Sequence, residues 1–132
     1  MQEFHVRSRA RTELIDITGE VRAAIQKEGV ESGLCLVFCP HTTAAVTIQE
    51  NADPDVVADL LGELNKMVPF SDDYRHGEGN SAAHIKSSLV GCSTTLLIEG
   101  GRPVLGTWQA IYFCEFDGPR NRTVVVKTCG GA

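Results

Sequence analysis

The amino-acid sequence predicts a single α+β domain built on a mainly antiparallel or mixed β-sheet with about three helices. The chain has 132 residues, which is the usual length of one domain. Its apolar content of 42 % and its charged content of 22 % are typical of folded globular proteins. No internal repeat, linker or low-complexity segment divides the sequence. We therefore expect residues 1–132 to form one domain in which strands and helices are mixed irregularly.

The chain begins with two predicted strands and a short helix. Residues 2–9 alternate between apolar and polar side chains, as a half-buried strand does, and residues 13–17 are predicted to form a second strand. Thr18 is expected to cap a helix over residues 19–29, which Gly29 ends. The apolar face of this helix carries Val21, Ala24 and Ile25.

The next segment, residues 34–39, is a nearly continuous apolar run, which predicts a buried central strand. Pro40 ends this strand, and residues 44–48 are predicted to form another. Cys35 and Cys39 both lie in the central strand. Four residues of a strand span roughly 13 Å, which is too far for a disulfide bond. Both cysteines are therefore predicted to be small core residues.

A second helix is predicted to begin at Asp53 and Pro54, because aspartate is a favoured N-cap and proline is favoured at the first helical position. Asp55, Asp59 and Glu63 are expected to form a solvated row on its outer face. Its apolar face is predicted to carry Val57, Leu60, Leu61, Leu64 and Val68.

The second half of the chain is predicted to contain a loop, a third helix and three strands. Residues 69–79 have the composition of a loop. The third helix is expected from Asn80 or Ser81 to Val90. The strands are predicted over residues 93–98, 104–116 and 123–128, with turns at Gly100–Gly101 and Asp117–Pro119.

The net charge of −5 is distributed unevenly along the sequence. Residues 28–65 contain no Lys or Arg and carry seven carboxylates, so the rest of the chain is about neutral. Because no basic stripe is present, we expect neither a nucleic acid nor a membrane surface as a partner. The expected partners are small molecules, metal ions or further copies of the chain.

Five cysteines are present, which is an odd number, and the N-terminal segment lacks the apolar run of a signal peptide. No apolar run reaches the ~18 residues of a membrane span. We therefore predict a cytoplasmic protein whose thiols are reduced.

The first candidate site is the polar sequence His41, Thr42 and Thr43, which joins two apolar strands. A polar cluster at the end of a buried strand is a favourable place for a site, since the strand positions the loop side chains. An ordinary turn, in which the threonine hydroxyls bond the backbone, explains the same residues.

The second candidate site lies on the third helix. If Ala82, Ile85 and Leu89 face the core, His84 lies on the opposite side between Ser81 and Ser88. His76 precedes it in the loop. Together with His41, these two histidines can supply three imidazoles to one Zn²⁺ or similar ion and leave a fourth position open. A lone histidine at such a position is more often a plain surface residue, which is the alternative explanation of His84.

Two further polar groups interrupt the last strands. Strand alternation places Thr107 and Gln109 on the side of the apolar core and Trp108 on the other side, and a buried polar side chain needs a partner. Asp117 and Arg120 follow in a turn, and an arginine there suits bidentate phosphate binding. The alternatives are that Gln109 satisfies backbone groups, that Asp117 serves the turn and that Arg120 is an ordinary surface residue.

Five short segments, in this order, resemble the YjbQ-like family, which is described as a family of secondary thiamine-phosphate synthases. The segments are HTTAA at residues 41–45, NADPDV at 51–56, AHIKSSLVG at 83–91, GTWQ at 106–109 and EFDGPR at 115–120. The resemblance spans residues 33–126, and the opening strand and helix fit it as well.

The resemblance implies an α+β fold in a homotrimer with sites near the subunit boundaries. It also implies a reaction that joins hydroxymethylpyrimidine pyrophosphate to a thiazole phosphate and releases pyrophosphate. The polar positions of the family motifs are His41, Thr42, Thr43, Asp53, His76, His84, Gln109, Asp117 and Arg120.

From this resemblance we expect a divalent metal ion, Zn²⁺ or Mg²⁺, that His41, His76 and His84 hold against the phosphate oxygens of a phosphorylated heterocyclic substrate. Further phosphate contacts are expected from Arg120, Lys86, Asn80 and Ser81. The catalytic set is expected to be His41, Thr42, Thr43, Asp53, Gln109 and Asp117. A metal-dependent phosphoester hydrolase and a non-catalytic binder of a phosphorylated metabolite or metal remain alternatives.

Overall fold

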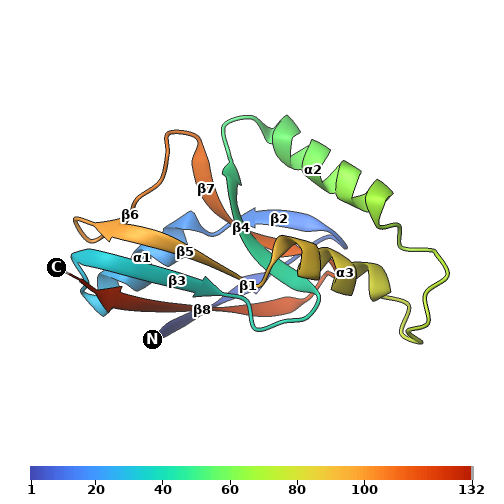
Figure 1. The fold of residues 1–132 in the computed structure, drawn as a ribbon, viewed down its shortest axis with the longest axis horizontal. Coiled ribbons are helices and arrows are strands. Elements are labelled where there is room, and N and C mark those ends of the chain that lie inside the picture. The colour runs from blue at the N-terminus through green and yellow to red at the C-terminus, as the bar shows by residue number, and fades with distance from the viewer. Residues whose placement is uncertain (132) are drawn as a thin grey trace.

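The computed structural model describes residues 1–131, which form two antiparallel sheets and three helices (Figure 1). Neighbouring strands follow the order β1-β8-β3-β5-β6 in the larger sheet and β2-β7-β4 in the smaller one. The larger sheet consists of β1 (Gln2–Arg7), β8 (Asn121–Gly130), β3 (Ser32–Phe38), β5 (Ser93–Glu99) and β6 (Arg102–Pro103). The smaller sheet consists of β2 (Glu13–Asp16), β7 (Gln109–Glu115) and β4 (Ala44–Glu50). The predicted α+β class is confirmed.

The three helices are α1 (Thr18–Glu28), α2 (Pro54–Met67) and α3 (Ser81–Val90), all close to their predicted positions. Gly29 ends α1 in the left-handed conformation, with φ of 72°, and the Asp53 carboxylate accepts the Asp55 N–H at the start of α2. The expected cap at Thr18 is wrong, because its hydroxyl oxygen accepts the Ile111 N–H of β7 instead. Within residues 1–131, no helix has the length and apolar character needed to cross a membrane.

The main core lies where α1 and the inner faces of both sheets meet. Cys35 and Cys39 are fully buried in it, as predicted for small apolar residues. The largest buried side chains of this core include Ile17, Ile25, Ile98, Ile111 and Phe113. All five cysteines of the chain are free thiols.

The central strand β3 is buried on one face and exposed on the other, which corrects the prediction from its apolar run. Cys35 and Val37 point into the core, whereas Leu34 is 48 % exposed and Leu36 is 42 % exposed. The reason is that none of the three helices of residues 1–131 covers this side of the larger sheet (Figure 1). An apolar run therefore did not mean burial on both faces of the strand. We name the exposed side the outer apolar face; it comprises Leu34, Leu36, Phe38 and Leu97.

The strand predicted over residues 104–116 is shorter than expected, because the chain turns before Gln109 enters β7. The Gln109 side-chain oxygen accepts the Gly106 N–H at 2.8 Å and closes this turn. Trp108 is exposed, and Thr107 and Gln109 do not enter the core. The prediction of an inward-facing Gln109 is therefore wrong.

Helix α3 presents a different face to the core from the one predicted. Ala82 is buried as expected, but Ile85 and Leu89 are exposed, and Ala83 and Lys86 are buried in their place. The physical reason is close packing, since two adjacent alanines let α3 lie directly against the smaller sheet.

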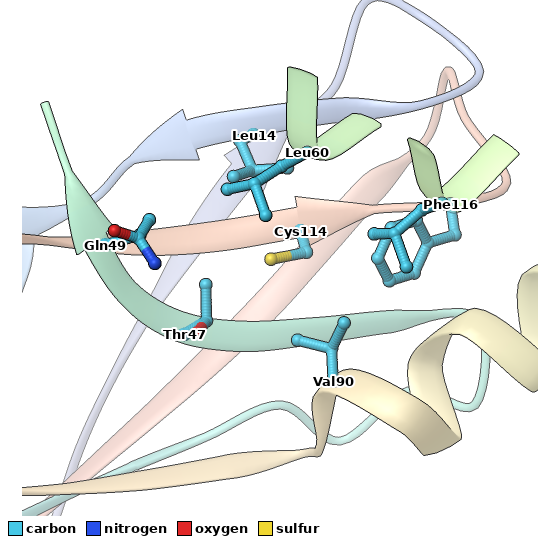
Figure 2. Close-up of a pocket in the computed structure, with 8 residues that line it drawn as sticks. Leu14, Thr47, Gln49, Leu60, Val90, Cys114 and Phe116 are labelled. Atoms are coloured by element: carbon cyan, nitrogen blue, oxygen red, sulfur yellow. The ribbon is translucent and has the colours of Figure 1, made fainter. Parts of the chain in front are cut away.

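Helix α2 packs more loosely than the other two helices. Its predicted outer carboxylate row is exposed, and Val68 at its end is buried, but no residue within the helix is fully buried. A mostly apolar cavity of about 90 Å³ separates α2 from the smaller sheet (Figure 2). Its lining comprises Leu14, Thr47, Gln49, Leu60, Leu64, Val90, Cys114 and Phe116.

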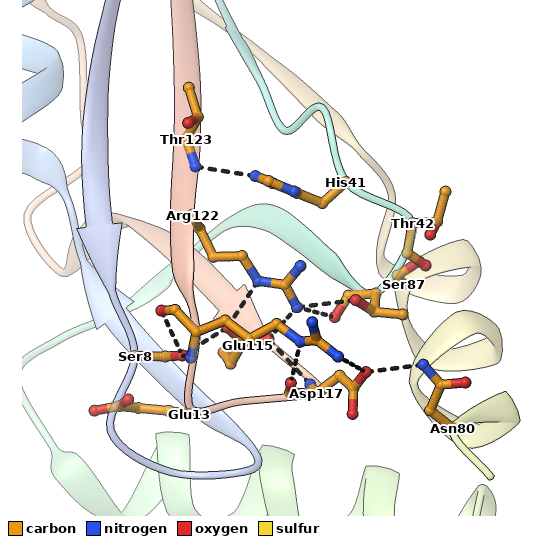
Figure 3. A network of polar contacts seen from close by, with 12 residues as sticks. Ser8, Glu13, His41, Thr42, Asn80, Ser87, Glu115, Asp117, Arg122 and Thr123 are labelled. Atoms are coloured by element: carbon orange, nitrogen blue, oxygen red, sulfur yellow. Dashed lines mark hydrogen bonds and ion pairs between the residues drawn. The ribbon is translucent and has the colours of Figure 1, made fainter. Parts of the chain in front are cut away.

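A buried ion pair joins the two sheets (Figure 3). Glu115 at the end of β7 is fully buried, and Arg122 at the start of β8 is 5 % exposed. Arg122 donates to both carboxylate oxygens, and the same oxygens also accept the Ser8 hydroxyl at 2.7 Å and the Asp117 N–H at 3.0 Å. Burial alone raises the pKa of the Glu115 carboxyl, but these hydrogen bonds outweigh burial and hold the pKa below its ordinary value.

We predict that Glu115→Gln lowers the free energy of unfolding at pH 7 by about 3–5 kcal/mol, because Arg122 is left buried without its counter-charge. Denaturant unfolding followed by circular dichroism measures this change. Glu63→Gln on the exposed face of α2 is the control, expected to change stability by less than about 0.5 kcal/mol.

The lowered pKa of Glu115 also fixes the sign of a pH effect. The ionised Glu115 carboxylate stabilises the folded state fully above the ordinary carboxyl pKa of 4.5. This stabilisation is lost as the pH falls through the lower pKa that Glu115 has in the folded state. Below pH 4.5, the parent protein should therefore lose stability more steeply than Glu115→Gln. Equal slopes in the two proteins would contradict this role of Glu115.

Candidate functional site

An open hollow of about 610 Å³ lies between the loop that follows β3 and helix α3. The loop contributes His41 and Thr42, and α3 contributes His84. The first and second sequence-predicted sites therefore meet in one place. The lining comprises His41, Thr42, His84, Ser87, Ser88, Gly91 and Cys92, and it contains no carboxylate.

His41 is held in one tautomer by the backbone of β8. Its Nε2 accepts the Thr123 N–H at 2.9 Å (Figure 3), so the proton of the neutral ring resides on Nδ1. Burial, and after it the nearby Arg122 guanidinium, lowers the pKa of the His41 imidazole. His41 is thus a neutral hydrogen-bond donor at the edge of the hollow.

The two threonines of the loop have different roles. The carbonyl and the hydroxyl of Thr43 both accept hydrogen bonds from buried Arg122, so Thr43 lies outside the hollow. The Thr42 carbonyl accepts the Ser87 hydroxyl of α3 at 2.7 Å, and Thr42 lines the hollow. The loop is therefore fixed from both sides.

A second open hollow of about 530 Å³ lies on the other side of His84. The rings of His76 and His84 meet edge to face, with their centroids 5.4 Å apart. Ser81 lines this hollow and Ser88 lines the first, so the polar stripe predicted on α3 faces both. The lining of the second hollow comprises Asp73, Tyr74, Arg75, His76, Ser81, His84 and Ile85.

The three histidines do not form a metal centre as they stand. Within residues 1–131, no group of three or more His, Cys, Asp or Glu side chains is arranged to hold a metal ion. The Nε2 lone pair of His41, which a metal would need, is already engaged by the Thr123 N–H. The donor set thus does not fit the expected ion in this arrangement, and a divalent cofactor stays a prediction.

Asp117, Arg120 and Asn80 form a polar cluster between the turn after β7 and the start of α3, and none of them lines either hollow. Figure 3 shows the contact between Asp117 and Asn80. The Asp117 carboxylate accepts the Asn80 amide at 2.8 Å and the Arg120 guanidinium at 3.0 Å, and Arg120 is 54 % exposed. Among residues 1–131, the buried Oδ1 of Asn80 has no hydrogen-bond partner. Such an acceptor gains free energy when a donor reaches it.

Three predicted site residues lie elsewhere. The Lys86 ammonium is buried on the far side of α3, where it donates to Asn65 at 2.6 Å and lies 3.8 Å from the centre of the Phe70 ring. Burial lowers the pKa of Lys86, and nearby Arg11 lowers it further. Asp53 and Gln109 lie at the opposite end of the smaller sheet from Glu115, as the pairing of Glu50 with Gln109 requires.

Glu115, Arg122 and Ser8 organise the site but were not among the predicted site residues. A signal for two of them is present in the sequence. Strand alternation puts Glu115 on the same side as Ile111 and Phe113, and it puts Arg122 on the same side as the buried valines of β8. Two opposite charges on inward-facing positions must pair when they are buried.

A family model described as UPF0047 protein YjbQ-like matches residues 2–131. The chain belongs to this family. The UPF0047 protein YugU of Bacillus subtilis is 52 % identical over 131 residues, which cover 98 % of the chain and 99 % of that protein. A UPF0047 protein of Methanocaldococcus jannaschii is 49 % identical over 128 residues, covering 97 % of the chain and 93 % of the relative.

Solved structures similar to this chain have the same fold. The crystal structure of a YjbQ/UPF0047-family protein from Clostridium acetobutylicum has a TM-score of 0.96 and 53 % identity, covering 98 % of this chain and all of that one. The structure of a conserved hypothetical protein from Thermus thermophilus has a TM-score of 0.91 and 43 % identity, with the same coverage. The family assignment therefore holds for the whole domain.

We predict that an NMR titration of the four histidines finds His41 with its proton on Nδ1 and a pKa below the ordinary value of 6.5. Long-range ¹H–¹⁵N spectra distinguish the two ring nitrogens. A proton on Nε2 would show that the Thr123 contact does not form in solution. A titration midpoint at or above 6.5 would contradict the effect of burial and of Arg122 on His41.

Proposed function

We propose that the protein binds a phosphorylated heterocycle and a second heterocycle on the two sides of His84 and joins them with release of pyrophosphate. The observation that carries this proposal is that one imidazole lines two adjacent open hollows. A condensation of two ring compounds needs two neighbouring spaces, because the reacting atoms must be held in line about 3–3.5 Å apart.

The hydrogen-bond donors beside the hollows suit an anionic group. The first hollow offers the Nδ1–H of His41 and the hydroxyls of Thr42 and Ser88, and no carboxylate opposes an anion there. The second offers Arg75 and His76, and one carboxylate, Asp73, also lines it.

The proposed reaction places modest demands on these residues. The ring nitrogen of a thiazole attacks the methylene carbon attached to the pyrimidine, the carbon–oxygen bond breaks and its electrons leave with pyrophosphate. No proton has to be removed from carbon, so a strong base is not required. The residues of the two hollows orient the rings and stabilise the charge that develops on the leaving oxygen.

Binding is tested by isothermal titration of the full-length protein with a pyrimidine pyrophosphate and a thiazole phosphate, separately and together. We predict that His84→Ala weakens binding at least about tenfold, as the loss of a hydrogen bond to a charged group does. His5→Ala is the matched control, since His5 is exposed on β1 and lines neither hollow. Unchanged binding in His84→Ala would overturn the shared-imidazole arrangement.

Turnover separates the proposed reaction from its alternatives. Release of pyrophosphate with formation of the coupled product supports the condensation. Release of inorganic phosphate from simple phosphoesters, without coupling, identifies a hydrolase. Binding without turnover identifies a non-catalytic binder and overturns the catalytic part of the proposal.

We also propose that the protein acts in the cytoplasm as a homotrimer, in keeping with its five free thiols and its outer apolar face. Exposed apolar patches of this kind commonly mark protein–protein contacts. We predict that Leu97→Lys, at a position that is 59 % exposed, lowers the mass found by sedimentation equilibrium from a trimer toward a monomer. The control Ala23→Lys, on the exposed side of α1, should leave the mass unchanged. A monomeric parent protein would refute the trimer.

A further inference from the structure

Two cysteine thiols lie opposite each other where β3 and β5 end beside the first hollow. In the antiparallel register of these strands, Phe38 pairs with Ser93. The next pair in the same register is Cys39 and Cys92, and the Cys39 N–H donates to the Cys92 carbonyl at 2.7 Å. The Cα atoms of directly opposed residues in an antiparallel ladder are about 4.5–5.5 Å apart, which lies inside the range of about 4.4–6.8 Å found in disulfides.

The two side chains also belong to the same face of the sheet. Cys35 and Val37 point into the core on β3, and Leu96, the partner of Cys35, is buried with them on β5. Because side chains alternate along a strand and directly opposed residues share a face, Cys39 and Cys92 continue this inner row. Cys39 is buried, whereas Cys92 is exposed and lines the first hollow.

We propose that Cys39 and Cys92 form a reversible intramolecular disulfide when the protein meets a hydroperoxide. The exposed Cys92 thiolate attacks the peroxide oxygen, the oxygen–oxygen bond breaks, and an alcohol or water leaves after taking up a proton. The Cys39 thiol then attacks the resulting Cys92 sulfenic acid, the sulfur–sulfur bond forms and water leaves. Both thiols are oxidised, and the peroxide is reduced.

The difference in exposure assigns the order of these two steps. Burial raises the pKa of the Cys39 thiol to about 11, so Cys39 is a poor first nucleophile and is shielded from reagents. The product would link the residue before Pro40 and His41 to the residue after Gly91, and thus join the two walls of the first hollow. The disulfide is therefore an oxidative modification that restricts the His41 loop, whatever ligand the hollow binds.

The test is peptide mapping of the folded full-length protein after treatment with hydrogen peroxide, under non-reducing conditions. The expected product is a linked pair of peptides that contain Cys39 and Cys92, with loss of both thiols and recovery of both after dithiothreitol. Amide hydrogen exchange of residues 41–43 should slow at least about threefold in the oxidised form, because a cross-link reduces local opening.

Three variants control this test. Cys92→Ser should abolish the link and leave Cys39 unmodified, and Cys39→Ala should let Cys92 proceed to sulfinic acid or to a link between chains. Cys129→Ser removes the other exposed thiol, which faces no cysteine across the sheet, and should form the link as the parent does. Oxidation of Cys92 in the parent without any link to Cys39 would overturn the proposal, and so would a Cys92–Cys129 link in its place.

Discussion

The buried ion pair between Glu115 and Arg122 is the interaction on which the rest of this structure depends. A carboxylate and a guanidinium without access to solvent lose several kcal/mol of hydration each, and they recover it only when every polar atom is paired. Here the four hydrogen bonds to the Glu115 oxygens meet that condition. They also connect the ends of both sheets with the loop after β1. The main effect of the pair is to fix the positions of the segments that it joins. Its net contribution to stability is small, since apolar residues of equal volume commonly stabilise a protein as much as a buried ion pair does.

The ion pair between Glu115 and Arg122 determines the geometry of the candidate site. Arg122 holds Thr43 from one side and Ser87 holds Thr42 from the other, so the loop between β3 and β4 has little freedom. His41 is then fixed by the N–H of Thr123, the residue next to Arg122. The Asp117 N–H is bound by Glu115 itself, and the Asp117 carboxylate positions Asn80 at the start of α3. Loop, helix and turn are thus arranged around one buried charge pair.

The sequence predicted the element order well, because capping residues, glycine stops and apolar periods are local signals. Asp53, Gly29 and the inward face of α1 are examples in which local chemistry and the fold agree.

The errors in the prediction arose where tertiary packing decides the structure. The hydrophobic periodicity of the sequence does not predict that one face of β3 is exposed. It also does not predict that α3 turns its two alanines toward the core, since a helical wheel of α3 has apolar residues on both sides. His41, Thr42 and His84 were brought together as expected, whereas Gln109 closes a local turn and Lys86 binds Asn65 and Phe70.

The charge distribution acquires a different meaning once the fold is known. In the sequence, His41 lies inside a long stretch without any basic residue, which argues against an anionic ligand near it. In the fold, the carboxylates of that stretch at Asp55, Asp59 and Glu63 lie on the exposed face of α2, and none of them lines the first hollow. The first hollow contains no carboxylate, and Arg122 lies near His41 and lowers the pKa of its imidazole.

Charges interact through space, and solvent screens exposed carboxylates. The electrostatic field at His41 is therefore set by the buried ion pair and not by the residues that neighbour His41 in the sequence. An anionic ligand is therefore compatible with this end of the molecule, despite the net charge of −5.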